Sequence, residues 1–557
     1  MASYTIGVDF GTLSGRALLA DTATGAEVSH AAMDYPHGVM SRCLPDGTAL
    51  GLDWALQHPQ DYLDVMATVI PAVLAESGVS PDEVRGIAVD CTASTFFPVR
   101  RDGTPLCFLP EYAGNPHAWP KLWKHHAPQD KANRLTELAL ARKEPWLPLY
   151  GGRVSSEWQL PKVWETLDSA PEIYDAADFF VEAADWITWM LCGNPAKASS
   201  IAGYKGFWRR SGGYPSPEWY RAVDPRLADY VPEKLGYPMA DPGERVGRLT
   251  AAMAAQTGLR EGIAVAAASI DAHVTLPAAA IDRPGAMLAI MGTSTCHLLL
   301  GERETAVPGI CGVAQGGIYP GWHGYEAGQS CVGDHFAWFI DNCLPAAYRG
   351  EAEQSGQGIH ALLREKARRL APGESGLLAL DWWNGNRSVL VDVDLTGLFL
   401  GMTLQTRPEE LYRALIEATA FGTRKIIENF RDGGLTVTEF VAAGGISRKD
   451  PLTMQIYADV IGLPVHIAGS VQGPALGSAI YAAVAAGLYP DILAAARAMG
   501  RLEKTVYRPI PEHCRVYDRL YAEYDRLHEY FGRGENDVMK RLKSIRREAG
   551  LERKQQI

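Results

Sequence analysis

Hydrophobic and polar residues near the start of the chain follow an order that predicts a β-hairpin. An apolar, β-rich run ends at Asp9, a turn of glycine, threonine and serine follows, and a second apolar run begins at Arg16. Two extended runs joined by a few small residues are typical of paired antiparallel strands. We therefore predict two such strands over residues 4–21.

The tip of this hairpin is suited to phosphate oxygens. Gly11 and Gly15 have no Cβ, so backbone N–H groups there stay open to a ligand, beside the hydroxyls of Thr12 and Ser14. The carboxylate of Asp9 can hold the water shell of a Mg²⁺ ion. An ordinary hairpin whose turn requires glycine explains this stretch equally well, so the pattern alone leaves both interpretations open.

A second segment repeats the same order far along the chain. Residues 288–300 form an apolar run, a tip of small residues and another apolar run, and the tip is Gly292, Thr293, Ser294 and Thr295. A repeated hairpin favours the phosphate interpretation over the ordinary turn. Two related hairpins so far apart predict a duplicated fold in which a nucleotide lies between the halves.

The rest of the chain alternates between strand and helix periodicity. Apolar spacing predicts strands over residues 27–35 and 84–89, and helices over residues 59–76 and 179–191. A strand, a crossover helix and a second strand in this order predict a mostly parallel sheet covered by helices. The predicted fold class is therefore α/β.

A glycine pair marks another candidate ligand contact. Gly444 and Gly445 lie between a predicted strand that begins at Glu439 and a predicted helix. Glycine at a helix start lets a ribose and an adenine lie against the backbone. Glycine pairs before helices are common, so this prediction depends on the two hairpins.

Asp271 follows a strand of small apolar residues, 262–269. A carboxylate at the end of a buried strand has limited access to water, so its position there needs a reason. One hypothesis is that Asp271 is the N-cap of the next helix. The other is catalysis, because in-line phosphoryl transfer needs a carboxylate that accepts the proton of the attacking hydroxyl.

Length and composition limit the classes of function. A chain of 557 residues predicts two large domains, and a net charge of −12 argues against general binding to nucleic acid or anionic membranes. The nine cysteines are scattered without a Cys-x-x-Cys pair, as in cytosolic proteins with reduced thiols. The sequence contains no Gly-Lys dipeptide, which excludes a Walker A motif.

The order of these motifs resembles that of the FGGY carbohydrate kinases, which belong to the sugar-kinase, Hsp70 and actin ATPase superfamily. Residues 158–164 (Trp-Gln-Leu-Pro-Lys-Val-Trp) resemble the first signature of the family, and residues 395–402 resemble the second. The resemblance extends from Tyr4 to about Tyr530. It implies an α/β architecture of two ribonuclease-H-like domains with a central cleft.

The resemblance also implies a division of the chain. Residues 1–281 would form an N-terminal domain that binds the sugar and carries the catalytic base, and residues 282–531 would form a C-terminal domain that binds ATP. Residues 532–557 form a basic tail, which we expect to be a solvated helix or a subunit contact.

The same resemblance implies the residues of the site. The sugar would contact Ala93 through its backbone, Lys205 in a glycine-flanked loop, Asp271 as general base, and Glu326. Asp9 and Asp271 would hold Mg²⁺, directly or through water. ATP and its phosphates would contact Gly11, Thr12, Ser14, Arg16, Gly292, Thr293, Ser294, Gly444 and Gly445.

Within the family, the likeness is greatest to bacterial enzymes that phosphorylate L-ribulose. It rests on residues 90–95, 204–207, 269–273 and 321–328. The expected partners are L-ribulose, ATP and a second copy of the chain in a homodimer, with no nucleic acid or membrane. The alternatives are a kinase of the same family for another pentulose or polyol, and a non-kinase ATPase of the Hsp70 or actin type.

Overall fold

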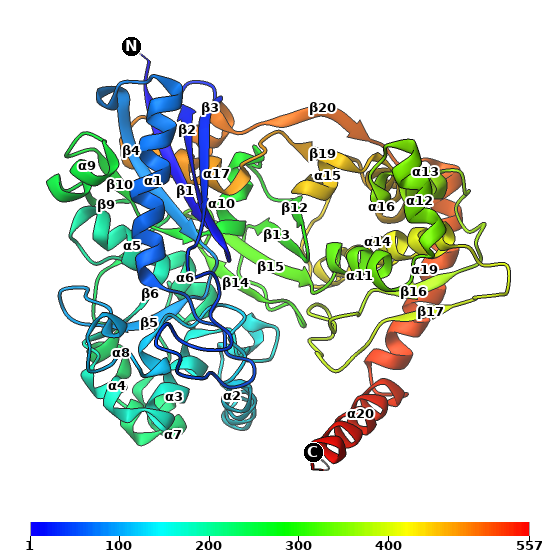
Figure 1. The fold of residues 1–557 in the computed structure, drawn as a ribbon, viewed down its shortest axis with the longest axis horizontal. Coiled ribbons are helices and arrows are strands. Elements are labelled where there is room, and N and C mark those ends of the chain that lie inside the picture. Colours follow the sequence, from blue (N-terminus) through cyan, green and yellow to red (C-terminus); the bar gives the residue numbers. More distant parts are fainter. Residues whose placement is uncertain (1, 556–557) are drawn as a thin grey trace.

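The computed structural model describes residues 2–555 and contains two seven-stranded sheets (Figure 1). The first sheet has the order β3-β2-β1-β4-β10-β9, and β11 also pairs with β4. Its strands are β1 (Tyr4–Phe10), β2 (Ser14–Asp21), β3 (Glu27–Asp34), β4 (Val84–Cys91), β9 (Arg245–Arg248), β10 (Ala264–Ala266) and β11 (Ser269–Ile270).

The second sheet has the order β14-β15-β13-β12-β18-β19-β20. Its strands are β12 (Ala286–Met291), β13 (Thr295–Gly301), β14 (Gly312–Gln315), β15 (His323–Gln329), β18 (Glu439–Ala443), β19 (Val465–Ala468) and β20 (Leu502–Tyr507).

The two sheets share one design. Three antiparallel strands, β3-β2-β1, continue through the parallel strands β4 and β10 to the antiparallel strand β9. In the second sheet β15-β13-β12 continue in the same way through β18 and β19 to β20. Both predicted hairpins are therefore confirmed, as is the predicted fold of two ribonuclease-H-like α/β domains.

Helices from both parts of the chain cover the first sheet. Helix α1 (Pro59–Ser77) packs on β2 and β3, whereas α17 (Gly473–Ala485), from near the end of the chain, packs on β1 and β4 (Figure 1). The approach of α17 is close, because a Cβ on Gly7 would lie 1.8 Å from the carbonyl oxygen of Ala475. The hydroxyl of Thr5 donates a hydrogen bond to the Ala479 carbonyl at 2.8 Å.

A helix pair joins the two halves. Helix α10 (Asp271–Ala278) packs on α17, and a Cβ on Gly477 would lie 1.7 Å from the carbonyl oxygen of Val274. One buried apolar cluster contains Leu18 of the first sheet, Leu288 of the second sheet and residues of both helices. The pair therefore lies between the sheets and sets their relative position.

The remaining elements surround the two sheets. In the N-terminal half they are β5 (Phe96–Val99), α2 (Gln129–Arg142), α3 (Gln159–Ser169), α4 (Pro171–Ala176), β6 (Phe179–Glu182), α5 (Ala183–Cys192), β7 (Lys197–Ala198), α6 (Ser199–Lys205), α7 (Pro217–Val223), α8 (Tyr230–Lys234), β8 (Met239–Ala240) and α9 (Ala251–Thr257). In the C-terminal half they are α11 (Gly333–Asn342), α12 (Ala346–Ser355), α13 (Ile359–Arg368), β16 (Leu378–Leu380), β17 (Leu398–Leu400), α14 (Pro408–Asp432), α15 (Gly445–Lys449), α16 (Pro451–Ile461), α18 (Ile492–Met499), α19 (Pro511–Gly532) and α20 (Val538–Gln555).

Two local predictions were wrong. The helix predicted over residues 179–191 begins only at Ala183, because residues 179–182 pair with β5 as strand β6. Lys205, predicted in a loop, is the last residue of α6 and is buried. In both cases tertiary packing outweighs the local pattern. Among the described residues, no helix combines the length and hydropathy that a membrane crossing requires.

We expect Gly7→Ala to lower the Tm, because the new methyl group would overlap the backbone of α17. Overpacking of this kind costs about 1–3 kcal/mol of stability. The matched control is Gly350→Ala in α12, where no atom lies within 4 Å of the added Cβ. That control should hold or slightly raise the Tm, since alanine favours a helix over glycine by up to about 1 kcal/mol. Calorimetry checks both variants, and an unchanged Tm for Gly7→Ala contradicts the packing.

Candidate active site

Strand register gathers three carboxylates at one edge of the first sheet. Strands β1, β4 and β11 run parallel, with Asp9 opposite Asp90 and Ser269 also opposite Asp90. Asp271 begins α10 directly after β11. Carboxyl ends of parallel strands meet at one edge of an α/β sheet, where ligands bind. Sequence reasoning placed Asp9 and Asp271 in the site but assigned no role to the Asp90 carboxylate.

Burial and mutual repulsion disfavour ionisation of these acids. Burial, and next the charge of Asp9, raise the pKa of Asp271 to about 7. Burial raises the pKa of Asp9, although Arg16, with Nε 3.4 Å from Oδ2 of Asp9, partly offsets it. Burial and Asp9 also raise the pKa of Asp90 well above its usual range. A group with surplus negative charge and little water favours a cation.

The carboxylates offer oxygen atoms of the kind that Mg²⁺ prefers. Oδ2 of Asp90 accepts a hydrogen bond from the hydroxyl of Ser478 on α17, and Oδ1 of Asp90 is buried without a partner among the described residues. Together with the surplus negative charge, this unpaired oxygen makes the group fit a hydrated divalent cation. Arg16 lies beside Asp9 and Ser14, 3.4 Å from the Ser14 hydroxyl, so its guanidinium already has protein partners.

The hypothesis that Asp271 is the N-cap of the next helix is wrong. Ile270 occupies the N-cap of α10, and Asp271 is the first helical residue. Oδ1 of Asp271 accepts a hydrogen bond from the N–H of Ala272 at 2.7 Å. The carboxylate of Asp271 accepts this hydrogen bond at the sheet edge. A carboxylate that acts as an acceptor there can also accept a proton.

A second charged group lies beside Asp271 and joins the two halves. Nζ of Lys205 lies 3.4 and 3.5 Å from the two carboxylate oxygens of Glu326 on β15, and Nε2 of His273 lies 3.3 Å from Oε2. Arg387 donates to Oε1 at 3.1 Å. Burial opposes the ionisation of Glu326, but Lys205 and the other donors outweigh it and hold its pKa below the usual range.

The structure connects these two groups electrostatically. Glu326 raises the pKa of Asp271 and Lys205 lowers it, although burial and Asp9 have larger effects. Lys205 and Glu326 are almost fully buried. An acceptor carboxylate thus lies beside a fixed cation and a fixed anion, an arrangement that can orient several hydroxyl groups. His273 and Arg387 were missed, because nothing in their local sequence indicates contact with Glu326.

The loop that contains Ala93 follows β4 and is held by buried polar residues. The N–H of Thr95 donates to Oε2 of Glu182 at 3.0 Å, and Nζ of Lys162 donates to the Ser94 carbonyl at 2.6 Å. Lys162 lies on α3, within the first signature-like segment of the sequence. The segment therefore holds the residue next to Ala93, a contact that sequence reasoning did not predict.

Each hairpin tip is closed by a backbone hydrogen bond from its first glycine, and the first tip is one residue longer than the second. A hydrogen bond of 2.9 Å from Gly11 to the Ser14 carbonyl closes the first tip, and one of 2.9 Å from Gly292 to the Ser294 carbonyl closes the second. Thr293, in the second tip, is exposed.

Gly15 differs from its prediction. Its missing Cβ makes room for the side chain of Val65 of α1, which lies 2.5 Å from the Cβ position, rather than for a ligand.

Other predicted phosphate and nucleotide contacts lie near these tips. The Thr12 hydroxyl accepts a hydrogen bond from the indole N–H of Trp123 at 3.1 Å. Gly444 has φ 92° and approaches β12, since a Cβ there would lie 2.4 Å from the carbonyl oxygen of Met291. Met291 ends the strand that leads into the second tip. The structure thus brings the glycine pair of residues 444 and 445 beside that tip.

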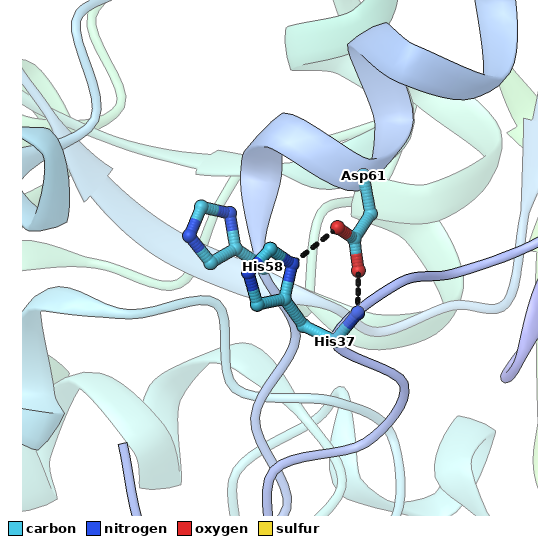
Figure 2. A group of neighbouring side chains, drawn as sticks. All are labelled: His37, His58 and Asp61. Atoms are coloured by element: carbon cyan, nitrogen blue, oxygen red, sulfur yellow. Dashed lines mark hydrogen bonds and ion pairs between the residues drawn. The ribbon is translucent and has the colours of Figure 1, made fainter. Parts of the chain in front are cut away.

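A third group with metal-binding residue types lies at the start of α1. Figure 2 shows Asp61 between the Nδ1 atom and the backbone N–H of His37, at 2.6 and 3.2 Å. Nδ1 of His58 accepts a hydrogen bond from the N–H of Gln60 at the N-cap of α1. These contacts use Nδ1 of both histidines and both carboxylate oxygens of Asp61, and the bond to His58 caps the start of α1.

The geometry can be compared with known proteins. The FGGY family of carbohydrate kinases, N-terminal domain, matches residues 4–277, and the C-terminal domain of the same family matches residues 287–486. The chain is 54% identical over 548 residues to a protein named ribulokinase from Halalkalibacterium halodurans, covering 98% of this chain and 97% of the relative. It is 53% identical over 545 residues to the ribulokinase of Geobacillus thermodenitrificans, covering 97% and 96%.

Solved structures share the fold. A xylulose kinase from Rhodospirillum rubrum has a TM-score of 0.78 at 24% identity and covers 94% of this chain and 98% of its own. A gluconate kinase from Lactobacillus acidophilus has a TM-score of 0.79 at 16% identity and covers 96% and 99%. Both family matches and the full-length relatives lead to one conclusion: the chain belongs to the FGGY family of carbohydrate kinases.

Proposed function

We propose that this kinase transfers the γ-phosphoryl group of ATP to the 5-hydroxyl of L-ribulose, which yields L-ribulose 5-phosphate and ADP. The observation that carries the proposal is the identity of 53–54% over nearly the full length to proteins named ribulokinase. The buried acceptor carboxylate beside Lys205 and Glu326 supports it, because a ketopentose presents several hydroxyl groups that must be oriented at once.

In this proposal Asp271 is the general base. Its pKa of about 7 lies near neutral pH, where a carboxylate of this kind can accept the proton of the attacking hydroxyl. Lys205, Glu326 and the backbone of Ala93 would orient the sugar. The contact between Lys205 and Glu326 spans the two halves, so closure of the halves would complete the sugar site and exclude water.

In this proposal ATP and Mg²⁺ bind at the acidic sheet edge, the two hairpin tips and the glycine pair of residues 444 and 445. Asp9 and Asp271 would hold Mg²⁺ through water, and the ion, when bound, neutralises charge on the transferring phosphates. Gly444 and Gly445 would contact the adenosine. The residues proposed to position the phosphates through N–H and hydroxyl groups are Gly11, Thr12, Ser14, Arg16, Gly292, Thr293 and Ser294.

We also propose the division of the chain into residues 1–281, 282–531 and 532–557, with movement about residues 281–285. The division follows the change from the first sheet to the second, which occurs between α10 and β12. A homodimer remains the expected assembly, and sedimentation of the purified protein would measure it.

The first test is ADP release with Mg-ATP and a panel of acceptors. We expect a high rate with L-ribulose and lower rates with D-ribulose, D- and L-xylulose, ribitol, arabitol and glycerol. The control without sugar should release little ADP. Preference for another acceptor would assign a different substrate within the family, and sugar-independent release would favour a simple ATPase.

The second test is the pH dependence of kcat/KM for L-ribulose, which reports groups of the free enzyme. Because the base must be ionised, activity should fall as the pH drops through about 7, by about tenfold per pH unit, and level off above about pH 8. A coupled assay with excess coupling enzymes at each pH measures the profile. A profile that stays flat through neutral pH contradicts a base with this pKa.

The third test is Asp271→Asn, which keeps the size of the side chain but removes the proton acceptor. We expect kcat to fall by about 10²- to 10⁴-fold, the usual contribution of a general base, while ATP binding stays nearly unchanged. Asp432→Asn, at the exposed end of α14, is the matched control and should behave as wild type. Turnover near the wild-type rate in Asp271→Asn would overturn the assignment.

A further inference from the structure

The segment between β16 and β17 carries a cation to the sugar side of the site. Nη2 of Arg387 donates to Oε1 of Glu326 at 3.1 Å, and the hydroxyl of Ser388 accepts a hydrogen bond from the N–H of Gly328 at 3.2 Å. Both contacts are with β15. The segment therefore contacts β15 at two places: the carboxylate of Glu326, and the backbone N–H of Gly328, two residues further along the strand.

These contacts define the orientation of the Glu326 carboxylate. Arg387 binds Oε1, His273 binds Oε2, and Lys205 lies within 3.5 Å of both oxygens. Without Arg387, Oε1 would keep only the longer contact with Lys205. Arg387 is thus placed to hold the carboxylate in one orientation, although it lies outside the group proposed to contact the sugar.

The segment is closed on itself next to Arg387. Asn386 and Asp392 exchange two backbone hydrogen bonds, each of 2.9 Å, and the side chain of Asn386 accepts a third from the N–H of Leu390. A displacement of Asp392 therefore moves Asn386, and with it the neighbouring Arg387.

Helix α20 is attached to this closed loop by charge. Nζ of Lys540 lies 2.8 Å from Asp392, Nζ of Lys543 lies 3.2 Å from Asp394, and Arg547 lies 3.1 Å from Asp394. Lys543 also donates to the carbonyl oxygen of residue 393 at 2.6 Å. Figure 1 shows α20 beyond the second sheet, at the end of α19. Three basic residues of the tail thus have acidic partners on one loop.

An apolar contact and a backbone contact reinforce the attachment. Met539 is buried, and its sulfur accepts a hydrogen bond from the N–H of Thr396 at 3.4 Å. At the end of α19, a Cβ on Gly532 would lie 2.3 Å from the side chain of Leu390. The loop of residues 386–397 is therefore held along its outer side by the C-terminal helices.

We propose that α20 acts as a strut: it holds the loop of residues 386–397 so that Arg387 positions Glu326 for the sugar. Arg387 is a positioning residue, because it acts through Glu326. The inference rests on the proposed function in that Glu326 is taken as a sugar contact. It gives the basic tail, which the sequence predicts to be a solvated helix or a subunit contact, a role within its own chain.

The test reverses the charges that attach α20. In Lys540→Glu/Lys543→Glu we expect the KM for L-ribulose to rise roughly threefold to tenfold, with kcat and the KM for ATP within about twofold of wild type. The control is Arg541→Glu/Arg546→Glu, which changes the net charge of α20 equally. Neither control residue forms an ion pair within the described part of the chain, and the control should keep the wild-type KM.

A charge exchange separates attachment from damage to the helix. Asp392→Lys/Asp394→Lys alone should raise the KM for L-ribulose as the helix variant does, and the four substitutions together should restore most of the wild-type value. Equal effects of the variant and its control, or no recovery in the exchanged protein, would overturn the strut.

A double-mutant comparison tests whether the helix acts through Arg387. Arg387→Gln should also raise the KM for L-ribulose and leave the KM for ATP unchanged. Adding Lys540→Glu/Lys543→Glu to Arg387→Gln should then have little further effect, because both changes release the same carboxylate. Additive effects would show that α20 acts by another route and would contradict the proposal.

Hydrogen exchange gives a readout that needs no substrate. The helix variant should speed amide exchange over residues 386–397, including the N–H of Asp392 that bonds to Asn386, and the matched control should not. If wild type releases no ADP with L-ribulose, the proposed function fails, yet the exchange rates still test the attachment. Unchanged exchange in the helix variant overturns the strut whatever the substrate.

Discussion

The close approach of α17 to β1 and α10 is the contact on which the rest of the structure depends. It is possible only because Gly7 and Gly477 lack a Cβ, since methyl groups there would lie 1.8 and 1.7 Å from carbonyl oxygens of the facing elements. This packing brings a late segment of the chain onto the first sheet and holds α10, whose first residue is Asp271. Ser478 of the same helix bonds to Asp90. The packing of α17 therefore helps to place both Asp90 and Asp271 in the acidic site.

The site that results has two parts of opposite character. At the sheet edge, Asp9, Asp90 and Asp271 are crowded and poorly solvated, which raises the pKa of each. Around Glu326, cations outnumber the carboxylate and hold it ionised. A carboxyl group with a pKa of about 7 thus lies beside a charged pair, and in the proposed mechanism the first accepts a proton while the second orients hydroxyl groups. Asp271 and Glu326 both carry a carboxyl group, but their different surroundings suit Asp271 to the proposed role of base and Glu326 to the proposed role of sugar contact.

The proposed sugar side is shared between the halves of the molecule. Lys205 and His273 come from the N-terminal half, whereas Glu326 and Arg387 come from the C-terminal half. Any movement of the halves therefore changes the geometry around Glu326. In the proposed strut, the attachment of α20 to the loop of residues 386–397 extends this dependence to the C-terminal helix.

Local pattern was enough to predict the elements that carry the residues of the proposed site. Two hairpins with small-residue tips, the strand before Asp271 and the glycine pair at residue 444 are visible in the sequence, because alternation and turn chemistry are local properties. Packing decided the rest. Lys205 became a buried helix end, Gly15 became a packing position for Val65, and residues 179–182 became a strand because β5 lies beside them.

The largest gap between sequence and structure concerns contacts between distant residues. Asp90 joins the acidic group through strand register, and Arg387 reaches Glu326 from 61 residues away. The loop that contains Arg387 forms ion pairs with a helix about 150 residues further on. The periodicity of apolar residues along the sequence gives no sign of such contacts. The sequence by itself determined the fold class, the family resemblance and the hairpins, since these depend on local order; only the tertiary structure decided which charges meet, because burial and proximity arise when the two halves pack together.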